Sequence, residues 1–187
     1  MKKLFTDLTL CVMFASLISC AKSQTNEVTY TIKKGSHYSN APHRIVHSKL
    51  NYTITFDASA MYSIDSVEQA DINKLFGFNS CSALHDYQSA RLGWRWYHDS
   101  LQIMYYIYDQ GERVYGYLTS VPMNVPSEYE LVQTDSEYRF KVNGVKFIYK
   151  KKWKCKALYN YHLWPYFGGN IKAPHDITIK FRRTNEK

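Results

Sequence analysis

The clearest pattern along the chain is the alternation of apolar and polar residues, which places every second side chain on the same face of a β-strand. In residues 49–56, Leu50, Ile54 and Phe56 fall on one face and polar residues fill the other. The same period of two, or a short run of strongly β-forming residues, predicts further strands over residues 28–33, 90–97, 101–108, 113–121, 128–134, 137–142, 145–149 and 175–182. The chain is therefore predicted to fold almost entirely as strands.

Turn and cap signals separate these strands. The dipeptide Asn143-Gly144 favours a type I′ turn between two neighbouring strands, and residues 109–112 are typical of another turn. Residues 70–78 have the apolar spacing of a helix, with Asp71 as its cap and Gly77 as its end. We therefore predict an all-β sandwich or jelly roll with one short helix near residues 70–78.

The N-terminus has the pattern of an export signal. Two lysines at positions 2 and 3 precede a mostly apolar stretch over residues 8–18. This stretch is too short to span a bilayer, which needs about 20 residues. It has the length of a signal-peptide core.

The residues that follow are Leu17-Ile18-Ser19-Cys20-Ala21, a pattern similar to the bacterial lipobox. We therefore predict a signal peptide over residues 1–19, a lipidated Cys20 with a polar tether over residues 20–27, and a single β-sandwich domain over residues 28–187. Lipid on Cys20 would hold the protein on a membrane of the cell envelope, expected to be the outer membrane. The alternative is an ordinary secretory signal with an incidental cysteine.

Composition adds a basic and aromatic character, with 17 Tyr, 9 Phe, 4 Trp and a formal net charge of +8. A basic, Tyr-rich surface suits an anionic polymer or the flat faces of sugars, whereas nucleic acid is not expected as a partner of an exported protein. The run of lysines over residues 150–156 concentrates much of the charge. The alternative interpretation is that the charge only keeps the domain soluble.

The cysteines left after export are Cys81 and Cys155, because Cys11 lies in the signal and Cys20 takes the lipid. The compartment outside the cytoplasm is oxidising, so a disulfide between Cys81 and Cys155 is expected. Two buried free thiols are the alternative. No cofactor and no metal ion is expected, because no ligand set in the sequence shows convergence.

Three stretches carry a resemblance to known proteins: residues 71–81, residues 89–97, and residues 164–170 with 173–179. Together they resemble a group of uncharacterised lipoproteins and secreted domains from Bacteroidetes, over residues 52–180. The fold of that group is similar to the concanavalin-like jelly roll of lectins and family 16-type glucanases. The resemblance implies a concanavalin-like fold and a pairing of Cys81 with Cys155.

Candidate binding residues come from the strand pattern. The Glu-x-Asp-x-x-Glu motif of the glucanases is absent. Polysaccharide lyases instead use Arg or Gln to neutralise a uronate, and Tyr or His to move a proton. Side chains of these types share strand faces or lie nearby in sequence: Arg91, Arg95, Tyr97, Gln102, Tyr106, Tyr108, His162 and Tyr166. Trp94 and Trp96, which alternate with the arginines, are predicted to be core residues.

The main functional hypothesis is a lectin-like domain that binds extracellular carbohydrate or an anionic polymer without catalysis, through the strand face of Arg91, Arg95 and Tyr97. One alternative is a polysaccharide lyase that acts on a uronate polymer, although only Gln102-Ile-Met stands where such lyases have Gln-Ile-His. Another is a structural or protein-interaction role at the cell envelope, with the candidates forming ordinary cross-strand pairs.

Overall fold

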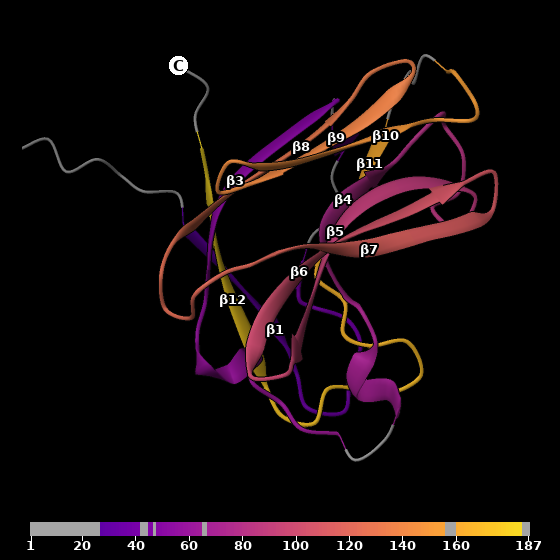
Figure 1. Cartoon of the computed structure of the whole chain (residues 1–187). Helices are drawn as coiled ribbons and strands as arrows, with labels where there is room; N and C mark the ends of the chain where they lie inside the picture. The colour runs from indigo at the N-terminus through magenta and orange to yellow at the C-terminus, as the bar shows by residue number, and fades with distance from the viewer. Residues whose placement is uncertain (1–26, 42–44, 47, 65–66, 156–159, 185–187) are drawn as a thin grey trace, which may run out of the picture.

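The computed structural model describes residues 27–41, 45–46, 48–64, 67–155 and 160–184 (Figure 1). Within these ranges the chain forms two six-stranded sheets that pack against each other as a sandwich. Cys20, together with the predicted signal and most of the tether, lies outside the described residues. No helix in the described ranges has the length and apolar character needed to cross a membrane.

The strands of the first sheet follow the order β1-β12-β3-β8-β9-β10. Their bounds are β1 (Glu27–Ile32), β12 (Ile177–Arg183), β3 (Lys49–Phe56), β8 (Ser127–Gln133), β9 (Glu137–Val142) and β10 (Val145–Lys150). The second sheet has the order β2-β11-β4-β5-β6-β7. Its strands are β2 (Ile45–Val46), β11 (Asn160–Leu163), β4 (Asn73–Asn79), β5 (Gln88–Tyr97), β6 (Ser100–Asp109) and β7 (Glu112–Ser120). Two short 3₁₀ helices, η1 (Ala58–Ala60) and η2 (Val67–Ala70), lie among the described connections.

The all-β sandwich is confirmed, but the short helix predicted near residues 70–78 is wrong, because this segment forms β4. The reason is a β-bulge between Lys74 and Phe76. The bulge interrupts strict alternation, so Leu75 and Phe76 are adjacent in sequence and both fully buried. With Ile72, they give the apolar spacing of a helix, and a short apolar run cannot be assigned by periodicity alone.

Aromatic side chains fill the space between the sheets. Trp94 is fully buried and packs on Phe56 with ring centroids 5.3 Å apart. Trp96 is half-buried at the edge of the same core. Both tryptophans thus contribute to the core, as predicted, and several tyrosines do so as well: Tyr30, Tyr62, Tyr129 and Tyr138. Much of the aromatic content is therefore structural.

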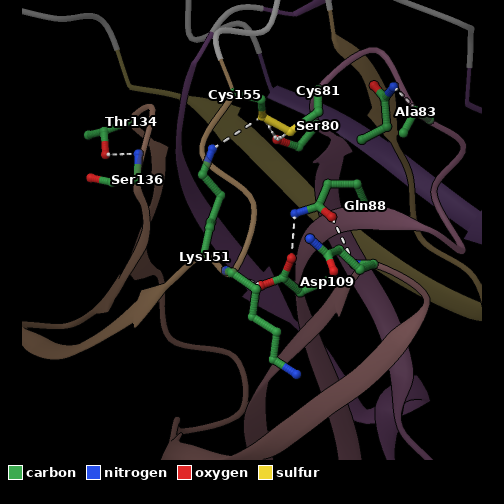
Figure 2. Close-up of a disulfide and its surroundings, with 12 residues drawn as sticks. Ser80, Cys81, Ala83, Gln88, Asp109, Thr134, Ser136, Lys151 and Cys155 are labelled. Atoms are coloured by element: carbon green, nitrogen blue, oxygen red, sulfur yellow. Dashed lines mark hydrogen bonds between the residues drawn. A yellow bond between two sulfur atoms is a disulfide. The ribbon is translucent and has the colours of Figure 1, made fainter.

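A disulfide joins the two sheets at one end of the sandwich. Cys81 follows β4 and Cys155 follows β10, and their Cα atoms are 5.5 Å apart, which confirms the predicted pairing. Figure 2 shows the Lys151 amine directed at the Cys155 sulfur, at 3.6 Å. Beside it, the buried Asp109 accepts a hydrogen bond from the Gln88 amide at 3.0 Å. This end of the domain is fixed by a covalent bond and a satisfied polar network.

Candidate functional site

The outer face of the second sheet carries a row of residues that crosses four strands and continues onto a fifth. Leu163 on β11 faces Gly77 on β4, which faces Arg91 on β5; Arg91 then faces Tyr106 on β6, and Tyr106 faces Tyr115 on β7. The neighbouring row points the other way and is largely core, so alternation directs this row away from the core. Strand pairing therefore assembles residues that lie far apart in sequence.

Parallel rows widen this face on both sides. On one side, Lys74 faces Gly93, which faces Met104 and then Tyr117. On the other side, Tyr108 on β6 faces Arg113 on β7. We call the set Lys74, Arg91, Tyr106, Tyr108, Arg113, Tyr115 and Tyr117 the cationic–aromatic face.

Arg91 occupies the centre of the cationic–aromatic face and is only 9% exposed. Its guanidinium carbon lies 5.9 Å from the centroid of the Tyr106 ring. Gly77 leaves room for its side chain, since a Cβ at that position would lie 2.9 Å from the Arg91 Cγ. In the described part of the chain, the Arg91 Nε has no hydrogen-bond partner and no carboxylate forms an ion pair with the group. Burying a charge without an ion pair is costly, so Arg91 is a candidate contact for an anionic ligand.

Lys74 lies next to Arg91 and is also largely buried. Its Nζ is 5.0 Å from the Tyr106 ring centroid and 5.7 Å from that of Tyr166, and it donates a hydrogen bond to the Gly168 carbonyl at 3.1 Å. Two backbone hydrogen bonds between Lys74 and Tyr166, of 2.8 and 3.0 Å, hold Tyr166 beside β4. Burial, reinforced by the positive charge of Arg91, lowers the pKa of Lys74 to about 8.

A hollow of about 590 Å³ opens beside these two cations, within the size range of small-ligand sites. Its lining includes Lys74, Arg91, His85, Tyr161, Trp164 and Tyr166. A smaller depression of about 120 Å³ adjoins Lys74 on the side of Tyr106 and Tyr115. A third depression, of about 140 Å³, lies on the opposite sheet and carries charges of both signs, from Glu128, Glu130 and Lys141.

The structure divides the predicted site residues into two groups. Arg91, Tyr106, Tyr108 and Tyr166 come together around Lys74. The other group consists of Arg95, Tyr97, Gln102 and His162, whose side chains are engaged in contacts of their own.

Arg95 lies on the same strand face as Arg91 but is committed to its neighbours. It donates to the Gln102 side-chain oxygen and to the Ala70 carbonyl, both at 2.8 Å, and its guanidinium packs over the Tyr97 ring at 4.6 Å. For Arg95, Tyr97 and Gln102 this arrangement matches the alternative in which the candidate residues form ordinary cross-strand pairs.

His162 projects toward the core from the inner side of β11 and is 3% exposed. Its ring stacks on Trp164 with centroids 3.6 Å apart, and its Nε2 lies 3.0 Å from the Tyr52 hydroxyl. It also lines the hollow. Its first role is therefore to pack this edge of the sandwich.

Sequence reasoning missed Lys74, because the bulge in β4 disguised the strand. It also missed Arg113, Tyr115 and Tyr117, although their alternation along β7 places all three on one face. That alternation was visible in the sequence, whereas the pairing of β7 with β6 was not. Among the described residues, no cluster of His, Cys, Asp or Glu is arranged to hold a metal ion.

Replacing Lys74 with methionine is expected to stabilise the fold. The folded-state pKa of about 8 lies below the ordinary lysine pKa of 10.5, so the unfolded chain binds more protons between these values. Wild-type stability should therefore rise as pH increases from about 8 to about 10.5. The Lys74→Met variant does not bury a charged amine, so at neutral pH its free energy of unfolding should exceed that of the wild type by about 1–3 kcal/mol. Urea unfolding of both proteins at pH 7 and pH 10 measures the difference, and a less stable variant at pH 7 would contradict it.

Comparison with known proteins identifies solved structures that share the fold. No protein-family model and no curated protein matches the sequence. An alginate lyase from a Chlorella virus has the same fold, with a TM-score of 0.57 and 16% identity over 84% of this chain and 82% of that one. The alginate lyase AlyC3 in complex with dimannuronate has a TM-score of 0.57 and 9% sequence identity, over 83% of this chain and 71% of that one.

A family 16 glycoside hydrolase for mixed-linkage glucan, from Bacteroides ovatus, gives a TM-score of 0.55 and 10% identity over 84% of this chain and 79% of that one. Likeness at these identities shows the fold alone. The concanavalin-like jelly roll is therefore confirmed. Membership of the Bacteroidetes lipoprotein group stays a prediction.

Proposed function

We propose that this protein binds an acidic, uronate-containing polysaccharide on the cationic–aromatic face, and that lipid on Cys20 holds it at the outer membrane. The observation that carries the first part is Arg91, a buried cation that forms no ion pair among the described residues, although the charge of Asp86 acts on it from a greater distance. A uronate carboxylate matches its planar fork, because guanidinium groups bind carboxylates through two parallel hydrogen bonds. Lys74 adds a second positive charge to the same hollow.

The aromatic rings supply the surface that a sugar needs. Tyr106 packs near Tyr115, at a centroid distance of 6.3 Å, and both rings belong to the outer face. Tyrosine offers an apolar ring with a polar end, which suits contact with a sugar ring and its hydroxyl groups. From β4 to β7 the face spans three strand spacings, about 14 Å. That length accommodates a chain of several sugars rather than one.

The comparisons support a polysaccharide as the ligand class, because the same fold occurs in proteins described as alginate lyases and glucan hydrolases. The positive charges of Arg91 and Lys74 favour an acidic polysaccharide over a neutral one. A neutral glucan would fill the hollow and leave Arg91 and Lys74 desolvated without compensation, which costs binding free energy. An acidic polymer supplies that compensation.

A binding panel on the domain from Glu27 onward tests the ligand class. We expect binding to at least one of alginate, polygalacturonate and glucuronan, weaker binding at higher salt, and none to laminarin or mixed-linkage glucan. The matched control is the binding polymer with its carboxyl groups reduced to alcohols, which keeps the backbone and removes the charge. Equal binding of that control, or no binding to any acidic polymer, would refute the proposal. Isothermal titration calorimetry is a suitable measurement.

A lyase is the second candidate, favoured by one specific observation. Lys74, with a pKa of about 8, lines the same hollow as Arg91, so a proton acceptor and a carboxylate-neutralising group are close together. β-Elimination creates an unsaturated sugar that absorbs ultraviolet light. Following absorbance during the same binding panel separates the candidates: a binding polymer that gives no increase is only bound.

The anchor part of the proposal depends on the pattern around Cys20 and is tested separately. In cells, the Cys20→Ser variant should move from the membrane fraction to the soluble fraction, because acyl chains supply the attachment. A variant that stays with membranes would contradict lipidation as the means of attachment.

A further inference from the structure

We infer that the disulfide between Cys81 and Cys155 is a site of thiol exchange, an inference that does not depend on the function proposed above. A small thiol such as glutathione attacks the Cys81 sulfur, and Cys155 leaves as a thiolate beside the Lys151 amine. The polar surroundings of the two sulfurs differ in charge. This difference decides which sulfur is attacked and which one leaves.

The positive charge lies on the Cys155 side of the bond. The Lys151 Nζ is 3.6 Å from the Cys155 sulfur, within hydrogen-bond distance for sulfur (Figure 2). The Cys81 sulfur is instead 3.5 Å from the neutral Ser80 hydroxyl, which is 4.0 Å from the Cys155 sulfur. An ammonium group stabilises a thiolate and lowers the pKa of the corresponding thiol. Cys155 is therefore the sulfur better able to carry the negative charge that cleavage produces.

The amine of Lys151 is held in this position by the turn between β8 and β9 and by β9 itself. The Lys151 amide donates to the Ser136 carbonyl at 2.8 Å, and the Cys155 amide donates to the Asp135 carbonyl at 3.1 Å. Both ends of the segment that joins the lysine to the cysteine are thus fixed to one turn. The Lys151 Nζ also lies 5.3 Å from the centroid of the Tyr138 ring, and the residue is only 5% exposed.

The Lys151 ammonium group forms no ion pair within the described ranges of the chain. Burial lowers the pKa of Lys151, although the carboxylates of Asp135 and Asp109 oppose this shift from beyond ion-pair distance. Asp109 is itself engaged by the Lys152 backbone amide, which donates to it at 2.7 Å. A thiolate on Cys155 would give the buried cation a negative partner, which the oxidised pair does not provide.

The exchange proceeds in two steps, and both cysteines are partly exposed, so a small thiol can reach the bond. The attacking thiol loses its proton to solvent and forms a bond to the Cys81 sulfur. The bond between Cys81 and Cys155 breaks, and its electron pair leaves with Cys155. A second thiolate then displaces Cys81 from the mixed disulfide. The protein gains two electrons, and the two small thiols are oxidised to their disulfide.

The first test locates the mixed disulfide on the domain from Glu27 onward, which contains all the described strands and only these two cysteines. The folded, oxidised protein is exposed briefly to glutathione and quenched with acid. Free thiols are capped with a maleimide, and the digest is mapped by mass spectrometry. We expect glutathione on Cys81 and maleimide on Cys155. The reverse labelling, an equal division, or no mixed disulfide on the folded protein would each overturn the inference.

The second test changes the cation. Lys151→Met should slow reduction of the folded protein by glutathione about three- to tenfold, because the departing thiolate loses its positive neighbour. Lys150→Met is the matched control: it removes the same charge from the adjacent, exposed residue and should react as the wild type does. Lys151→Arg keeps a cation and should react faster than Lys151→Met. A Lys151→Met protein reduced as fast as the wild type would refute the role of the lysine.

The third test keeps Lys151 and so remains decisive if Lys151→Met does not fold. The Cys81→Ser variant has Cys155 as its single thiol, and the rate of its reaction with iodoacetamide is followed against pH. We expect the midpoint to lie below about 8.5, the ordinary value for a cysteine, because the ammonium group favours the thiolate. A midpoint at or above that value would overturn the inference, since burial alone has the opposite effect on a thiol.

Discussion

Replacing Arg91 with methionine should abolish binding of the acidic polymer, with a loss of at least about a hundredfold in affinity, while the domain keeps its fold. Truncating one partner of a buried charge pair costs about 2–5 kcal/mol, and about 2.7 kcal/mol corresponds to a hundredfold. Methionine keeps an unbranched apolar side chain of similar length over Tyr106. Because Arg91 forms no ion pair in the described structure and the Asp86 carboxylate acts on it only from beyond ion-pair distance, its removal should cost the free protein little stability.

The measurement combines calorimetric titration with thermal unfolding of the same samples. Arg139→Met is the matched control, since Arg139 lies on β9 of the opposite sheet and is exposed. Arg91→Lys separates charge from geometry: it retains a cation without the planar fork, so an intermediate affinity is expected. An Arg91→Met protein that binds as tightly as the wild type would show that the ligand sits elsewhere. A strongly destabilised one would show that the side chain has a structural role.

Removing the disulfide with Cys81→Ser and Cys155→Ser together should lower the free energy of unfolding by about 4 kcal/mol. The crosslink joins residues 74 positions apart, and closing a loop of that length restricts the unfolded chain by about this amount. For a domain of this size the melting temperature should fall by about 8–16 °C. The effect should be global, because the bond connects β4 of one sheet with the end of β10 in the other.

Circular dichroism during heating measures this change, with and without a reductant. Reductant should lower the melting temperature of the wild type toward that of the double variant and leave the double variant unchanged. A wild-type protein that exposes two reactive thiols on unfolding, without reductant, would contradict the crosslink.

Local signals were enough to predict the β-rich fold. The alternation in residues 49–56 gives β3 with its exact bounds, and Asn143-Gly144 occupies the turn between β9 and β10. The pairing of Cys81 with Cys155 followed from the expected compartment, since these two cysteines are the ones that would remain after the predicted export. Each of these inferences depends on neighbouring residues or on counting, and not on which strands pair.

The site could be predicted only in part, because it depends on strand register. Alternation showed that Arg91 and Arg95 share a face, but not that Arg91 meets Tyr106 while Arg95 meets Gln102. Those pairings make the first arginine unpaired and the second fully engaged. Lys74 required a further fact, the bulge in β4, which no periodicity reveals. The position of His162 on the inner side of a four-residue strand was equally hidden.

Lys74 lines both the large hollow and the smaller depression. The protonation state of its amine therefore affects anion binding in either cavity. An anion that enters either cavity favours the protonated amine, and the proton it recruits is then already present for an anion in the other. If an anion binds in each cavity, the two binding events share the Lys74 proton, and any linkage between them is reciprocal. It strengthens as the pH rises toward the pKa of about 8, where the free amine becomes populated. A polymer that reaches both cavities gains from this linkage in a way that a single sugar does not.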